Sequence, residues 1–108
     1  LLVFPPFCDI VLLTLSSPNE KELLTATKLL ATRLRELLGG EYSDVPTVVF
    51  GPFEAPVYRV DGKYRMRLVI KCRLNRRSRA LFSQLLSEAS KSGRNTPTLT
   101  VDFNPSSL

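Results

Sequence analysis

The sequence contains no histidine, so it lacks the side chain that most often serves as a general acid or base at neutral pH. No serine or cysteine is flanked by a recognisable activating base, and nucleophilic catalysis therefore has no support. The acidic residues do not pair at metal-binding spacing. Asp9 and Asp102 could meet across two strands, but strand-end solvation or turn capping is the favoured role for both. We expect no catalytic residue, and an enzyme is the least favoured class of protein.

Cysteine is also scarce. Cys8 and Cys72 are too few and too far apart for a local metal site. Both fall in apolar strand patterns, where two buried thiols are favoured over a disulfide. No glycine-rich run opens a helix with the lysine that a phosphate loop requires. The sequence therefore predicts no metal and no cofactor.

Long apolar runs are missing as well. No segment reaches the length of a membrane span, and we expect a cytoplasmic protein without a membrane partner. The 108 residues suffice for one domain with one modest core. The chain opens with Leu1 in place of an initiator methionine and leads through Pro5 and Pro6 almost directly into a strand. We therefore expect an excised domain of a larger protein.

Positive charge is abundant and unevenly distributed. Eleven of the fifteen Lys and Arg residues fall between Arg59 and Arg94, against two acids in that segment, which makes a net charge of +9. Residues 1–58 carry four basic and seven acidic residues, a net of −3. A cationic segment this concentrated favours a polyanion or an acidic peptide as partner. The alternative is a solvated surface whose charges are incidental.

The basic segment has a strand-like pattern between Tyr64 and Arg73. Successive side chains on a strand point to opposite faces, so a period of two separates one buried face from one exposed face. The apolar register holds Tyr64, Met66, Leu68, Ile70 and Cys72. The other register holds Arg65, Arg67, Lys71 and Arg73, interrupted only by Val69. This pattern predicts a strand with a row of cations on its exposed face.

Periodicity and turn signals predict four strands and two helices. Ser17 is expected to cap the first helix with Pro18 at its first position, and Asn75 to cap the second. The Asp61-Gly62 pair predicts a hairpin, and Gly51-Pro52 and Pro56 predict an irregular second strand. The expected strands span 10–15, 47–50 continued through 57–60, 64–73 and 98–103, and the expected helices span 18–38 and 76–91.

This β-α-β-β-α-β order predicts an α+β fold of the split βαβ type, a four-stranded antiparallel sheet with two helices on one face. The first and third strands should be central, with the row of cations on the face away from the helices. No aromatic residue is expected on that face, since Tyr64 falls on the apolar register and Tyr58 precedes the turn. The aromatic signature of an RNA-recognition motif is absent from the third strand.

Several motifs together resemble the C-terminal domain of the PriA family, the bacterial primosomal replication-restart helicases also called primosomal protein N′. The resemblance covers nearly the whole chain, and its most specific part lies around Gly51 to Arg65. The motifs are Phe4-Pro5-Pro6-Phe7, Gly51-Pro52-x-x-Ala55-Pro56-x-x-Arg59-x-x-Gly62-x-Tyr64-Arg65, Ile70-Lys71 and Asp102-x-Asn104-Pro105.

The resemblance implies a fold similar to that of a ribosomal small-subunit protein. It also implies a parent that is an ATP-dependent 3′-5′ DNA helicase, whose ATPase lobes and zinc-binding cysteines lie upstream, so this segment should neither hydrolyse ATP nor bind zinc. In the family this domain helps to bind branched DNA at stalled forks. With the helicase lobes it forms a pocket for the acidic C-terminal tail of the single-stranded-DNA-binding protein. Other primosome proteins are further expected partners.

Two sets of residues are the candidate contacts. Branched or single-stranded DNA would be bound through its phosphates, with steep salt dependence and no sequence preference. The DNA candidates are Arg59, Lys63, Arg65, Arg67, Lys71 and Arg73. By resemblance, the acidic tail would bind at the start of the second helix, where the candidates are Asn75, Arg76 and Arg79.

Other interpretations of these residues stay open. Arg59, Tyr64 and Arg65 could instead fix the bent hairpin, with the arginines bonding backbone carbonyls. The arginines after Asn75 could be the solvated face of a helix. For the whole chain, the alternatives are a ferredoxin-like RNA-binding module and a purely structural docking domain.

Overall fold

The computed structural model describes residues 9–90 and 97–105. Four strands form one antiparallel sheet in the order β2-β3-β1-β4. The elements are β1 (Asp9–Ser17), α1 (Glu20–Gly39), β2 (Thr47–Val60), β3 (Lys63–Cys72), α2 (Arg76–Ser90) and β4 (Thr98–Phe103). The predicted α+β fold and its element order are confirmed, and β1 and β3 are the central strands. The calls on Phe4 to Phe7, on Cys8 and on the end of the second helix at residue 91 lie outside the described residues.

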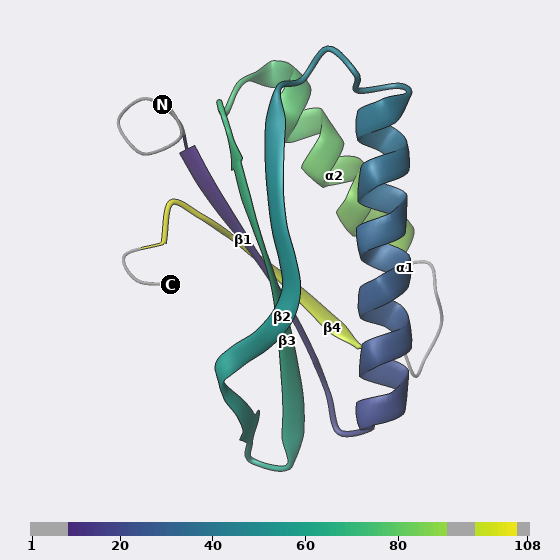
Figure 1. Cartoon of the computed structure of the whole chain (residues 1–108), viewed down its shortest axis with the longest axis vertical. Helices are drawn as coiled ribbons and strands as arrows, with labels where there is room; N and C mark the ends of the chain where they lie inside the picture. Colours follow the sequence, from purple (N-terminus) through teal and green to yellow (C-terminus); the bar gives the residue numbers. More distant parts are fainter. Residues whose placement is uncertain (1–8, 91–96, 106–108) are drawn as a thin grey trace.

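Both helices lie on the same side of the sheet (Figure 1), so one face of every strand contributes to the core and the other does not. The apolar register of β3 meets that of β1 through the cross-strand pairs Met66 with Leu15, Leu68 with Leu13 and Ile70 with Val11. Leu23, Leu30 and Leu34 of α1 and Leu81, Phe82 and Leu85 of α2 cover these pairs. Among the described residues, neither helix has the length and apolar composition needed to cross a membrane.

The first helix begins two residues later than predicted. Its N-cap is Asn19 rather than Ser17, because the Asn19 Oδ1 accepts a hydrogen bond from the Glu22 backbone N–H at 3.0 Å. Ser17 instead accepts a hydrogen bond from the Asn19 N–H at 3.1 Å, which holds the turn that precedes the cap. Pro18 therefore lies in that turn, outside the helix.

The Asp61-Gly62 hairpin is confirmed. Asp61 has φ 52° and Gly62 has φ 76°, and two adjacent residues with positive φ are typical of the type I′ turn that matches the twist of antiparallel strands. The turn fixes the pairing of Arg59 with Tyr64. It thereby sets which face each residue of β3 occupies.

The ends of β1, β3 and β4 are joined by a clasp between Asp9 and Asn104. Asn104 exchanges hydrogen bonds with the Ile10 backbone, through its Oδ1 at 2.9 Å and its own N–H at 2.6 Å. The Asp9 carboxylate accepts from the Leu74 N–H at 2.8 Å and from the Asn104 Nδ2 at 3.1 Å. Asp102 lies on the opposite face, paired with Leu12. Asp9 and Asp102 therefore do not form a catalytic pair, and Asp9 has the capping role that the sequence favoured.

The clasp should make stability depend on pH. Hydrogen bonds from Leu74 and Asn104 lower the pKa of Asp9 from its ordinary value of 3.8. The stabilisation is present above the unfolded pKa and is lost as pH falls through the lower folded pKa. We expect the wild type to be more stable than Asp9→Asn at about pH 6, and the difference to shrink toward about pH 2. Urea unfolding of both proteins measures it, and a difference that stays constant with pH would contradict this role.

Candidate nucleic-acid interface

The sheet face away from the helices is called the open face below. Arg65, Arg67 and Lys71 of β3 lie on it, since they alternate with the core residues Met66, Leu68 and Ile70. Lys63 falls on the same register at the hairpin end of the strand. Across β1 and β4, the open face continues through polar pairs, Thr14 with Thr100 and Ser16 with Thr98. The predicted side of the cation row is confirmed for these β3 residues.

Two phenylalanines also lie on the open face, where no aromatic residue was expected. Phe50 pairs with Val69 and Phe53 pairs with Arg67, so β2 presents both rings beside the cations of β3. Their side chains are 43% and 40% exposed. The Lys71 ammonium lies 5.2 Å from the centre of the Phe50 ring. For Phe53 the expectation failed because a bulge separates it from Phe50, and the register of β2 past that bulge cannot be read from the sequence; Phe50 lies before the bulge, which does not explain its omission.

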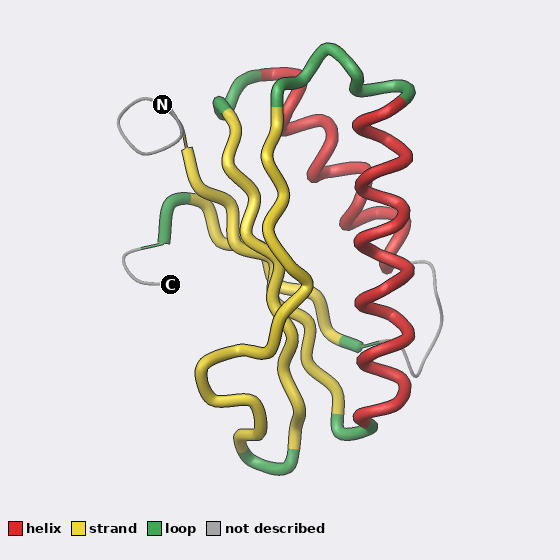
Figure 2. The backbone as a smooth tube through the Cα atoms, in the orientation of Figure 1, coloured by secondary structure: helices red, strands yellow, loops and turns green. Residues whose placement is uncertain are grey.

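The second half of β2 bulges out over the open face. Pairing with β3 shifts between Phe50 and Phe53 and again between Glu54 and Arg59. Figure 2 shows this part of β2 leaving the plane of the sheet on the side away from the helices. Gly51 has φ 106°, and the peptide between Gly51 and Pro52 is cis. The irregularity predicted from Gly51-Pro52 and Pro56 is present, and its direction places residues 55–57 above β3.

Contacts on both sides of the sheet hold the bulge in place. The Arg65 guanidinium donates two hydrogen bonds to the Val57 carbonyl, at 3.1 and 2.8 Å. On the helix side, the Tyr58 hydroxyl donates to Glu20 of α1 at 2.8 Å, and burial together with that bond raises the pKa of Tyr58 to about 12. Tyr58 also packs against Tyr64, with ring centroids 5.3 Å apart. Arg65 therefore has the backbone-bonding role that was the alternative to a DNA contact.

Arg67 differs from the other cations because it is only 7% exposed. It was expected on a solvent-facing row, but the bulge lies over it. Beneath the bulge is a cavity of about 320 Å³, open on one side. The cavity is lined by Leu12, Thr14, Ala55, Pro56, Val57, Arg65, Arg67 and Asp102. Arg65 and Arg67 are thus brought together at one cavity.

The other DNA candidates do not line this cavity. Arg59 is exposed and lies on the opposite face, with its guanidinium 5.3 Å from the centre of the Tyr64 ring. Lys63 is exposed at the hairpin tip, and Arg73 is exposed just past the end of β3, where its charge contributes to the lowered pKa of Asp9. The six candidates therefore do not form one continuous site. Arg65, Arg67 and Lys71 share the open face along β3, and Lys63 lies on the same face at the hairpin end of the strand.

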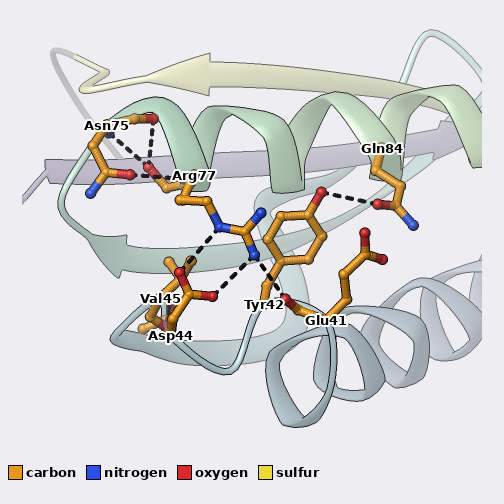
Figure 3. A network of polar contacts seen from close by, with 9 residues as sticks. Glu41, Tyr42, Asp44, Val45, Asn75, Arg77 and Gln84 are labelled. Atoms are coloured by element: carbon orange, nitrogen blue, oxygen red, sulfur yellow. Dashed lines mark hydrogen bonds and ion pairs between the residues drawn. The ribbon is translucent and has the colours of Figure 1, made fainter.

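The start of α2 is a capped helix end. Asn75 Oδ1 accepts from the Ser78 N–H at 3.0 Å and Ser78 Oγ accepts from the Asn75 N–H at 2.8 Å, a reciprocal cap. Arg77 is fixed beside this cap, bonded to both oxygens of Asp44 and to the Glu41 carbonyl, with its guanidinium 4.6 Å from the Tyr42 ring centre (Figure 3). This network ties α2 to the loop after α1. It also holds the pKa of Asp44 below its usual range.

Two tail candidates remain on the surface of α2. Arg76 is exposed and has no hydrogen bond or ion pair within the described part of the chain. Arg79 is exposed, and its guanidinium lies 5.9 Å from the centre of the Phe103 ring, itself 44% exposed. Asn75 differs from them because its oxygen is engaged in the cap. In residues 9–90 and 97–105, no cluster of three or more acidic or thiol side chains could hold a metal ion.

Comparisons with known proteins bear on both surfaces. The family model described as the primosomal protein N C-terminal domain matches residues 1–106. No curated protein matches the sequence. Among solved structures, the de novo designed protein Foldit4 is similar with a TM-score of 0.59 at 16% identity, over 91% of this chain and 97% of that one. A proposed aminohydrolase from methicillin-resistant Staphylococcus aureus has a TM-score of 0.56 at 9% identity, over 90% of this chain and 29% of that one. At these identities the two structures support the fold alone.

Proposed function

Since this chain belongs to the family of the primosomal protein N C-terminal domain and has a role in primosomal replication restart, we propose that it binds DNA at stalled forks through its open face. The chain acts as a binding module, and any ATP hydrolysis belongs to helicase lobes outside it. Those lobes, other primosome proteins and the single-stranded-DNA-binding protein are its proposed partners. Its place of action is then the cytoplasm.

The observation that carries this proposal is the pairing of cations with exposed aromatic rings on one face of the sheet. Lys71 lies beside Phe50, and Arg67 is the cross-strand neighbour of Phe53. Cations neutralise phosphates without reading sequence, and aromatic rings stack on unpaired bases. Asp102 is the one acidic residue among the paired open-face positions of the described strands. The combination suits a strand junction, where duplex and unpaired nucleotides occur together.

The same rings would also serve a single-stranded RNA reader, which is the alternative function. The family match favours DNA. The two are separated by the first titration, in which fluorescence anisotropy compares forked DNA, single-stranded DNA and RNA of equal length. We expect preference for the fork, and a preference for RNA would overturn the proposal.

The matched variants are two pairs of lysine substitutions that change the net charge equally. Lys63→Gln with Lys71→Gln removes two open-face cations, and Lys21→Gln with Lys28→Gln removes two exposed cations of α1 on the other side of the molecule. Relative to the wild type, the open-face pair should lose about tenfold in fork affinity at about 50 mM salt, and because its salt slope is shallower by about 1.5, the loss should nearly disappear at about 200 mM. The α1 pair should change little. Equal losses in both pairs would place the DNA elsewhere.

A second binding function is proposed at the start of α2, for the acidic C-terminal tail of the single-stranded-DNA-binding protein. Arg76 offers a guanidinium that has no partner among the described residues, and Arg79 lies beside the exposed Phe103 ring. This combination suits a peptide that carries both carboxylates and an aromatic end. A labelled tail peptide added to the same titrations should lose affinity in Arg76→Gln with Arg79→Gln and keep it in the open-face pair.

A further inference from the structure

Arg67 is a buried cation. The residue is only 7% exposed, and its side chain forms no hydrogen bond or ion pair with any part of the chain that the structure describes. A buried charge is costly unless it is paired. No buried side-chain nitrogen among the described residues lacks a partner. The guanidinium nitrogens therefore still have solvent access, and the surface they line is the cavity under the bulge.

The residues that line that cavity carry a net positive charge. Arg65 lies at the same cavity, and its guanidinium is already oriented by the Val57 carbonyl. Asp102 contributes one carboxylate, but it forms no ion pair with either arginine in residues 9–90 and 97–105. Two guanidinium groups against one unpaired carboxylate favour an anion, and guanidinium groups bind phosphate oxygens through paired, charge-assisted hydrogen bonds.

An aromatic residue across the sheet from Arg67 indicates which phosphate would bind. Phe53 lies directly across from Arg67 in the sheet and is 40% exposed. Cross-strand neighbours have Cβ atoms about 5 Å apart, which is a short enough span for a nucleotide to place its phosphate at one residue and its base at the other. A base can stack on the ring only where it is unpaired.

We propose that the cavity under the β2 bulge binds one backbone phosphate of an unpaired DNA strand, held by Arg67 and Arg65, with the adjacent base on Phe53. This inference rests on the proposed DNA-binding function and specifies where that function is carried out. It also gives Arg67 a reason to be buried, since the bulge covers the guanidinium and leaves it beside the cavity. Without that ligand, the buried charge of Arg67 lowers the stability of the fold.

The first test observes Arg67 itself, independently of DNA affinity. The NMR signal of its Nε–Hε group should move on addition of thymidine monophosphate and not on addition of thymidine. An oligothymidine of about twelve residues without terminal phosphates should move it as well. No movement with any of these overturns the inference, whatever the anisotropy titrations show for forks. Movement with inorganic phosphate or the mononucleotide but not with the oligonucleotide also overturns it, because the site would then take a free phosphate.

The second test uses matched variants. Arg67→Met keeps the aliphatic packing and removes the charge, and Lys28→Met makes the same charge change on exposed α1. Arg67→Met should lose at least about tenfold in oligothymidine affinity, as expected for charge-assisted hydrogen bonds, and Lys28→Met less than about twofold. The thermal midpoint of Arg67→Met without ligand should equal or exceed that of the wild type. Equal affinity losses, or a destabilised Arg67→Met, would show that Arg67 is structural.

Discussion

Replacing Phe82 with alanine is expected to lower the free energy of unfolding by about 3–5 kcal/mol. Phe82 is 1% exposed on the buried side of α2, and its ring meets the ring of Phe103 edge to face at 6.1 Å between centroids. The substitution removes that aromatic contact and leaves a cavity between α2 and the sheet. A domain of this size is stable by only about 5–15 kcal/mol, so a large share of that margin is lost.

Leu86→Ala is the matched control, because Leu86 lies on the same helix but is 37% exposed. Its truncation should cost less than about 1 kcal/mol. Urea unfolding monitored by circular dichroism gives both values. Similar small losses for the two variants would mean that α2 does not pack on the sheet as described.

The packing of α2 on the sheet, which Phe82→Ala tests, was predictable from the sequence because it depends on local patterns. The alternation from Tyr64 to Cys72 and the apolar stripe of α2 each specify a buried face, and Asp61-Gly62 specifies how β2 returns into β3. Strand order then follows from the handedness of the two crossovers. The first helix boundary was wrong because Ser17 and Asn19 are both capping residues two positions apart, and only their hydrogen bonds distinguish them.

The candidate site was predicted only in part, because it depends on a bulge. The alternation correctly placed Arg65, Arg67 and Lys71 on the face away from the helices. It could not show that Arg67 is covered, since its cover comes from residues ten to twelve positions earlier in the chain that leave the sheet. Phe53 was missed for the same reason. An extra residue in one strand reverses the face of every residue beyond it, and a sequence does not say where pairing resumes.

Gly51→Ala is expected to destabilise the protein by on the order of 2–3 kcal/mol, with the loss centred on the bulge. Gly51 has φ 106°, a conformation that residues with a Cβ rarely adopt. A Cβ at this position would also lie 3.0 Å from the Arg67 carbonyl oxygen and 2.9 Å from the Phe53 ring. The carbonyl belongs to the central strand and cannot yield without disturbing the sheet, so the bulge must shift instead.

The atoms that would crowd a Cβ at Gly51 belong to Arg67 and Phe53, both residues of the proposed phosphate site. The same substitution therefore tests whether the backbone conformation of Gly51 shapes that site. Gly51→Ala should weaken oligothymidine binding together with stability, although no charge is changed. Gly39→Ala is the control, since nothing lies within 4 Å of a Cβ there and alanine favours the helix end that Gly39 occupies. Urea unfolding measures the stability of both variants, and fluorescence anisotropy measures their affinity for oligothymidine. A Gly51→Ala protein with wild-type stability and affinity would show that the bulge neither needs this backbone conformation nor shapes the site.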